Sequence, residues 1–115
     1  MTVERIDLSG ELGASPGYAY VARATGTIVC TAGAVPLDAE GNVIGPDDLE
    51  TQTAAVIDSL AVALQGGGAE PDDVIKTTIY VVGERSNLGR AWRVFCTGPV
   101  RRRAEHTGGR DAPRL

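Results

Sequence analysis

The segment with the clearest chemical potential is Ala32-Gly33-Ala34, which follows the apolar and β-branched run Thr27–Thr31. The run predicts a buried strand. The three small residues leave the backbone almost bare, so a ligand or another chain can approach it closely. Pro36 and residues 38–42 then turn the chain at the surface. Taken alone, the pattern fits a ligand-approach site and an ordinary strand with its hairpin loop equally well.

Side chains that commonly bind metals are scarce. The chain has one histidine, His106, and two cysteines, Cys30 and Cys96, which lie far apart. No Cys/His spacing typical of zinc occurs, so the sequence predicts no metal site. Cys30 lies in an apolar run, which favours an inert core thiol. Two isolated cysteines indicate a reducing cytoplasm, and residues 1–7 lack the basic start and apolar segment of a signal peptide.

The length of 115 residues fits one domain, and no apolar run approaches the roughly 20 residues that span a bilayer. Charge is divided unevenly. Residues 1–92 carry 5 basic and 13 acidic side chains, whereas residues 93–115 carry 6 basic and 2 acidic ones. An acidic body with few aromatic residues argues against nucleic-acid binding. The basic tail fits either a solvated chain end or an anion site.

The N-terminal third is predicted to be strand-rich. Residues 3–8 alternate weakly and predict a strand, and residues 9–17 contain three glycines and a proline, which indicate a loop. Residues 18–24 predict a second strand. Thr25-Gly26 then turns this strand into the Thr27–Thr31 strand, so the two are expected to form an antiparallel hairpin.

Two helices are predicted further along. Gly45-Pro46-Asp47-Asp48 is a favourable helix start, because proline suits the first turn and carboxylates suit the positive end of the helix dipole. Gly66-Gly67-Gly68 is expected to end this helix. The second helix is expected at 86–96. Apolar positions at helical spacing are Leu49, Thr53, Val56, Leu60 and Leu64 in the first helix, and Leu88, Trp92 and Phe95 in the second.

Between the helices, residues 71–73 predict a loop and Val74–Val82 a strong strand. Its odd-numbered residues suit a helix-covered core, while Lys76, Thr78 and Tyr80 form an amphipathic second face. The order of elements indicates an α+β fold with the helices on one face of a mixed sheet. The second face of this sheet has no cover within the chain, which predicts association.

Several separated motifs together resemble the reactive-intermediate deaminase family, also called the RidA or YjgF-like family. The resemblance covers roughly residues 15 to 96. In chain order, the motifs are Gly17-Tyr18, the Thr31-Ala-Gly-Ala-Val-Pro-Leu-Asp-x-x-Gly41 block, Gln52-Thr53 with Leu60, Gly68-Ala69, and Asp73-Val-Ile-Lys-Thr-Thr-Ile-Tyr80.

The resemblance implies a chorismate-mutase-like α+β fold, with a mixed β-sheet and two helices packed on one face. It also implies a homotrimer with ligand clefts between subunits, which would cover the bare sheet face. Members hydrolyse enamines and imines, such as 2-iminobutanoate and 2-iminopropanoate, to a keto acid and ammonia without a metal or organic cofactor. Some members are described instead as ribonucleases or translation inhibitors.

By the same resemblance, Tyr18 matches the cleft tyrosine, with an ordinary sheet aromatic as the alternative. Gly33 matches the glycine of a Ser-Gly-Gln turn whose polar residues are replaced here by Ala32 and Ala34, so these three residues are the implied substrate-binding turn. Arg114 is the candidate carboxylate-binding arginine, one residue out of register. Gln52 matches a helix glutamine with a structural role.

The C-terminal part departs from the family. Residues 1–96 form the RidA-like unit, whereas 97–115 is an Arg- and Gly-rich tail without the two strands and the glutamate that the family carries. A truncated or frame-shifted product, a shortened form and a diverged member are the alternatives. Two functions follow: a RidA-like imine hydrolase with catalytic Tyr18 and Arg114, or a non-catalytic small-molecule-binding or regulatory member, or a truncated remnant, of the same family.

Overall fold

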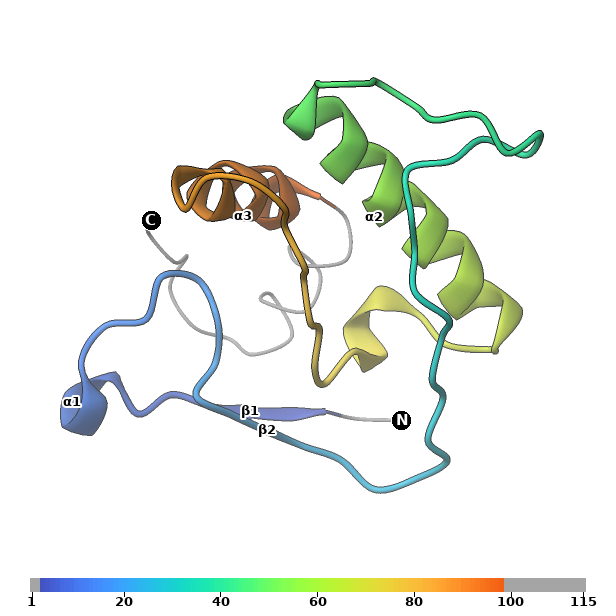
Figure 1. Cartoon of the computed structure of the whole chain (residues 1–115). Coiled ribbons are helices and arrows are strands. Elements are labelled where there is room, and N and C mark those ends of the chain that lie inside the picture. Colours follow the sequence, from blue (N-terminus) through green and yellow to red (C-terminus); the bar gives the residue numbers. More distant parts are fainter. Residues whose placement is uncertain (1–2, 99–115) are drawn as a thin grey trace.

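The protein is described by a computed structural model that covers residues 3–98. The main body is a pair of helices, α2 (Leu49–Gly66) and α3 (Ser86–Thr97), which pack against each other (Figure 1). Two short strands, β1 (Glu4–Ile6) and β2 (Val21–Arg23), form an antiparallel sheet below them. The predicted α+β class is therefore confirmed.

Helix α2 begins and ends near the predicted signals, although Pro46 precedes the N-cap and so lies outside the predicted first turn. Its N-cap is Asp48, whose carboxylate accepts hydrogen bonds from the backbone N–H (3.0 Å) and the hydroxyl (2.7 Å) of Thr51. These bonds favour the charged carboxylate and hold the pKa of Asp48 below its ordinary value. At the other end, Gly68 adopts a left-handed conformation (φ 79°), which glycine accepts without steric cost.

The core lies between α2 and α3. Ile57 and Leu64 from α2 and Phe95 from α3 are buried, and Trp92 stacks on Phe95 with 5.4 Å between ring centroids. Ile57 was absent from the predicted apolar face. Ile57 is covered in part by Gly98, the C-cap of α3, because a Cβ added to Gly98 would stand 3.1 Å from a methyl group of Ile57.

The predicted hairpin between 18–24 and 27–31 is wrong. β2 pairs with β1 instead, in an antiparallel register that places Glu4 opposite Arg23 and Ile6 opposite Val21. Gly26 lies at a bend with φ 147°, and residues 27–31 after it form no strand, so β2 has no hairpin partner there. A reversal at a two-residue loop requires primed turn geometry, which is not formed here.

The predicted loop at 9–17 contains a helical turn, α1 (Ser9–Leu12). Asp7 stabilises its start, because its two carboxylate oxygens accept hydrogen bonds from the backbone N–H (3.0 Å) and the hydroxyl (2.8 Å) of Ser9. The loop at 71–73 is a single 3₁₀ turn, η1 (Pro71–Asp73). Asp and Ser side chains form local hydrogen bonds of this kind in turns as well as at helix starts, so they do not by themselves predict a helix.

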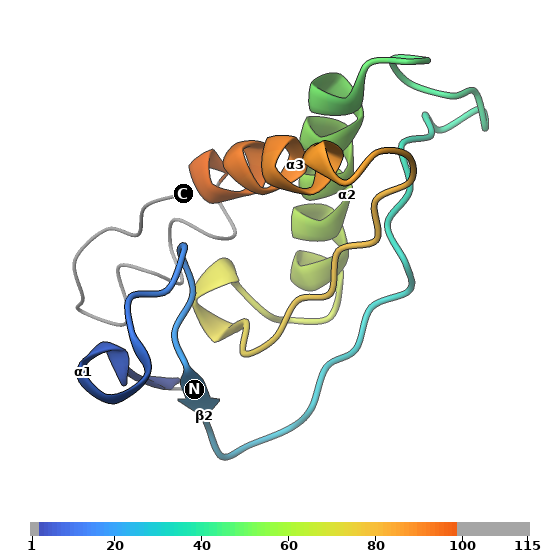
Figure 2. The same ribbon diagram turned by 60° about the vertical axis from the view of Figure 1, so that its left-hand side comes forward.

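Thr27–Thr31 and Val74–Val82 are not paired strands. Figure 2 shows both stretches as separate chain segments, neither of them drawn as a strand. The predicted alternation of Val74–Val82 holds only in part, because Ile79 and Val81 are partly buried whereas Ile75 is 54% exposed. Thr77, Ile79 and Val81 line a small hollow with Leu88 and Trp92 of α3, whereas Tyr80 is 92% exposed. Within residues 3–98, the sheet therefore consists of the antiparallel pair β1 and β2.

Candidate functional site: an apolar cavity beside the small-residue turn

A cavity of about 950 Å³ opens between α2 and the two unpaired segments. Residues 24–36 form one wall, and residues 73–82 form another. The remaining wall comes from α2, with Phe95 of α3 behind it. Small-molecule sites are commonly concave and mostly apolar with a few polar groups, which is the character of this lining.

The predicted substrate-binding turn lies in this cavity. Ala32, Gly33 and Ala34 are all lining residues. A Cβ added to Gly33 would meet no atom within 4 Å, so the backbone at this position faces open space. A ligand can therefore approach the peptide groups of the turn without displacing a side chain.

The wall that carries the turn is positioned by contact with α2. A Cβ added to Gly67, the C-cap of α2, would stand 2.8 Å from a methyl group of Val29. Val29 therefore lies directly against the glycine end of the helix. A larger residue at position 67 would push the wall away from α2.

The polar groups in the cavity come from all of its walls. Gln52 lines the cavity from α2, so the residue assigned a structural role in the sequence is placed where a ligand would contact it. Thr53 also lines it, but its hydroxyl donates to the carbonyl of Leu49 (2.7 Å) within the helix. Lys76 is the one lysine of the chain and lies in the opposite wall. These groups could orient a polar substituent on a small, largely apolar ligand.

Cys30 also lines the cavity and is exposed. The prediction of an inert core thiol is wrong, because no strand within residues 3–98 covers the Thr27–Thr31 segment. Among these described residues, no group of three or more His, Cys, Asp or Glu side chains is placed to hold a metal ion. In the same range, no helix is both long and apolar enough to cross a membrane.

Of the two predicted catalytic residues, the structure describes Tyr18, which lies outside the cavity. Tyr18 is half exposed and contacts Tyr20 edge-on, with 6.0 Å between ring centroids. It is not a lining residue of the cavity. Arg114 and the whole prediction for the tail after Gly98 lie outside the described residues. The turn therefore lines a cavity, whereas Tyr18 of the same chain does not.

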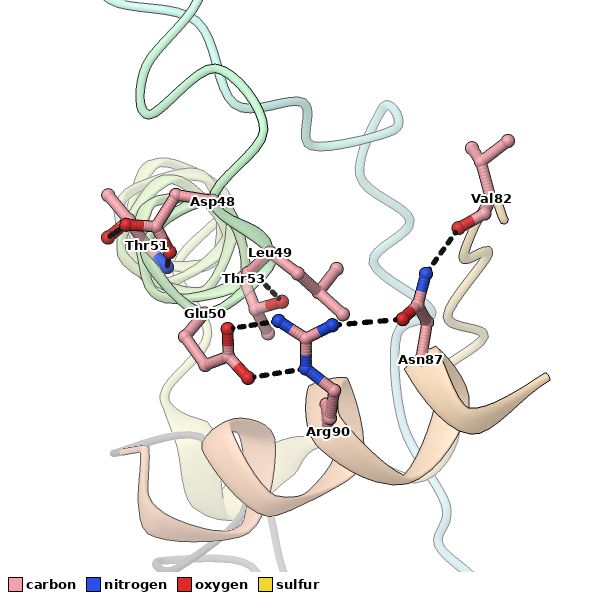
Figure 3. A network of polar contacts seen from close by, with 8 residues as sticks. All are labelled: Asp48, Leu49, Glu50, Thr51, Thr53, Val82, Asn87 and Arg90. Carbon is pink, nitrogen blue, oxygen red and sulfur yellow. Dashed lines mark hydrogen bonds and ion pairs between the residues drawn. The ribbon is translucent and has the colours of Figure 1, made fainter. Parts of the chain in front are cut away.

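A network of polar contacts connects the elements that surround the cavity (Figure 3). Glu50 of α2 accepts two hydrogen bonds from the guanidinium group of Arg90 of α3, at 2.7 and 2.8 Å. Arg90 also donates to Asn87 (3.1 Å), and Asn87 donates to the carbonyl of Val82 (3.2 Å). One chain of contacts thus joins α2, α3 and the end of the cavity wall.

This network predicts a pH dependence of stability. The hydrogen bonds from Arg90 hold the pKa of Glu50 below its ordinary value. A carboxyl group whose pKa is lower in the folded chain stabilises the fold above its unfolded pKa, and this contribution is lost as the pH falls through the folded pKa. We expect the urea midpoint to fall between about pH 6 and about pH 3, and to fall less in Glu50→Gln. Both side chains are about half exposed, so the difference should be small and should shrink further in high salt. Equal pH profiles for the two proteins at low salt would contradict this.

Comparison with known proteins identifies similar sequences. The profile of the family described as endoribonuclease L-PSP matches residues 9–100. A RutC family protein from Pyrococcus abyssi is 36% identical over 56 residues, which is 49% of this chain and 44% of that relative. The aligned stretch thus spans less than half of the curated relative. No solved structure gives a significant match.

Proposed function

We propose a function from the premise that the chain belongs to the endoribonuclease L-PSP family, which is the RidA/YjgF-like family that its motifs resemble. On this premise, the chain hydrolyses small enamine or imine intermediates to a keto acid and ammonia. The observation that supports this most directly is the cavity beside Ala32-Gly33-Ala34, because it presents an open backbone turn to a space large enough for such a molecule.

The reaction makes modest demands on the protein. The imine carbon is already electrophilic, so water adds to it and the resulting carbinolamine releases ammonia as the carbonyl forms. The site must hold the substrate and position one water, which proximity and orientation can accelerate strongly. Backbone N–H groups of the turn are suitable partners for a substrate carboxylate, and an arginine such as Arg114 would add a two-pronged contact. No metal or organic cofactor takes part in this proposal.

We further propose that the working site is shared between subunits of a homotrimer. Tyr18 lies outside the cavity of its own chain and is 50% exposed, so it is available to a neighbouring subunit. Tyr80 and Val82 are 92% and 91% exposed, which leaves apolar surface for such a neighbour to cover. In this proposal, residues 1–96 form the unit that assembles, and residues 97–115 are a separate tail. The proposed compartment of the protein is the cytoplasm.

A non-catalytic ligand-binding or regulatory role is the second candidate. It is favoured by the methyl groups of Ala32 and Ala34, which offer no proton donor or acceptor in the cavity. RNA cleavage, which the family description suggests, has less support. The residues described here include no histidine for general acid–base chemistry, and the body of the chain is acidic.

The test of the proposed function is ammonia release from a freshly generated 2-imino acid. We expect the purified protein to accelerate release over the buffer reaction. Tyr18→Phe and Arg114→Ala should each lower kcat/KM by about a hundredfold, because each removes a group that contacts the reacting molecule. Tyr20→Phe and Arg110→Ala are the matched controls and should retain activity.

Three outcomes separate the candidates. Acceleration that both site variants abolish supports the hydrolase. A correctly folded protein that binds a substrate analogue in calorimetry without releasing ammonia supports the binding role and excludes the hydrolase. Cleavage of RNA without ammonia release would replace both proposals.

A further inference from the structure

We propose that the preferred substrate is a 2-imino acid with a second acidic group at the far end of an apolar chain, and that Lys76 binds this second group. The first carboxylate then lies at the Ala32-Gly33-Ala34 turn, as in the proposed function, on which this inference rests. Lys76 therefore selects diacids over monoacids of the same length.

Lys76 is a positive charge without a counter-charge in the described part of the chain. It lines the cavity, and it does not line the small hollow beside Leu88 and Trp92 of α3. Within residues 3–98, its ammonium group forms no hydrogen bond or ion pair. No arginine of this range lines the cavity. Among the described residues, Lys76 is therefore the cationic group that a ligand in the cavity meets.

The nearest acidic residue in the chain does not supply the missing counter-charge. Asp73 also lines the cavity. Its carboxylate accepts a hydrogen bond from the backbone N–H of Glu70 (2.9 Å), as part of the capping box at the start of η1. Asp73 is thus held at its own turn and forms no ion pair with Lys76. The ammonium group of Lys76, on its flexible four-carbon stem, is left to bind a ligand.

The two groups that can bind an anion lie on different walls. The turn at Gly33 belongs to the wall formed by residues 24–36, whereas Lys76 belongs to the wall formed by residues 73–82. A single carboxylate held by the backbone N–H groups of the turn leaves the ammonium group of Lys76 without an anion. A molecule with an acidic group at each end contacts both walls, and the contact with Lys76 is a charge-assisted hydrogen bond.

The space between the two walls is largely apolar. Val56 and Leu60 of α2 line it together with Ile79, and all three side chains are partly buried. The cavity of about 950 Å³ is far larger than 2-iminopropanoate, whose side chain is one methyl group, would fill. Apolar surface is removed from water most favourably by apolar groups. The part of the substrate between its two acidic groups is therefore a chain of methylene groups.

Calorimetry with 2-oxo acids tests the second contact without requiring catalysis. The probes are 2-oxoadipate, which has an acid at each end, and its 6-methyl ester, which has the same chain and a neutral end. We expect the diacid to bind about fivefold or more tightly, because it adds one charge-assisted contact. High salt should reduce this preference by screening the charges. 2-Oxoglutarate, shorter by one methylene group, should bind about two- to fourfold more weakly than 2-oxoadipate.

Substitution of Lys76 tests whether this residue makes the contact. Lys76→Met removes the charge and should abolish the preference for the diacid over the ester, whereas Lys76→Arg should keep it. Arg85→Met is the matched control, because it removes one positive charge from an exposed residue outside the cavity. It should keep the preference. Lys76 is exposed as well, so all three variants should have the urea midpoint of the unmodified chain.

The outcomes separate the role of Lys76 from the proposed function. Ammonia release at equal kcat/KM from freshly generated 2-iminoadipate and its 6-methyl ester would support the hydrolase and overturn the selection of diacids. A diacid preference that Lys76→Met abolishes, in a protein that releases no ammonia, would support the second contact and overturn the hydrolase alone. The role of Lys76 is also overturned if the diacid and the ester bind equally, if neither binds, or if Lys76→Met keeps the preference. Binding of 2-oxoglutarate as tight as that of 2-oxoadipate would overturn the apolar chain.

Discussion

Replacing Phe95 by alanine is expected to lower the free energy of unfolding by about 3–5 kcal/mol. Phe95 is 4% exposed, stacks on Trp92 and packs with Ile57 and Leu64 in the buried cluster between the two helices. Few other side chains are buried in the described residues, so no second core can compensate. A domain of this size has a total stability of about 5–15 kcal/mol, so the loss removes a large part of it.

Urea denaturation followed by circular dichroism measures this effect. Val62→Ala, on the exposed side of α2, is the control and should change the free energy of unfolding by less than about 0.5 kcal/mol. Phe95→Leu removes less volume and keeps the effect measurable if the alanine variant fails to fold. The packing described for α2 and α3 would be contradicted by a Phe95→Ala midpoint equal to that of the control.

Replacing Gly33 by valine is expected to leave the fold intact and to lower the proposed activity. Nothing lies within 4 Å of an added Cβ, and Gly33 does not adopt the left-handed conformation. Stability should therefore change by less than about 0.5 kcal/mol. The branched side chain would occupy the space through which a ligand reaches the turn. We expect kcat/KM for ammonia release, or affinity for a substrate analogue, to fall by more than about tenfold.

Gly33→Ala provides the graded comparison for this variant. Its single methyl group should give a smaller loss of activity or affinity with the same stability. Calorimetry with a substrate analogue and a urea midpoint should be recorded on the same preparations. If Gly33→Val binds and reacts as the unmodified chain does, the turn is not part of the ligand site, whatever the activity of the protein.

Local sequence signals predicted the two long helices, α2 and α3, well. The start of α2 depends on Asp48 and Thr51, and its end on a run of glycines, so both boundaries are set by neighbours in the chain. The pairing of strands depends on distant residues. The sequence indicated that 18–24 would pair with its neighbour 27–31, but β2 pairs with β1, which precedes it by many residues.

The candidate site was predicted in part. The bare turn at Gly33 was recognised from its small residues and does line a cavity. The exposure of Cys30 and the position of Lys76 in the cavity wall were missed. The exposure of Cys30 and the position of Lys76 depend on whether neighbouring strands cover the two extended segments. Such cover is a property of the whole sheet. Residue alternation indicates which side chains share a face but cannot show whether that face is covered.

The part of the cavity wall formed by Thr25–Ala34 contributes more to ligand recognition than to the stability of the fold. Within residues 3–98 its backbone forms no hydrogen bond to another segment, and Val29 is its point of contact with the glycine end of α2. Ordering a residue costs about 1–2 kcal/mol of backbone entropy, and here no strand ladder offsets that cost. The wall therefore adds little to the stability that α2 and α3 provide. Most residues of this wall can therefore be substituted without unfolding the protein. The ligand specificity of the cavity can change during evolution while the core between α2 and α3 stays the same.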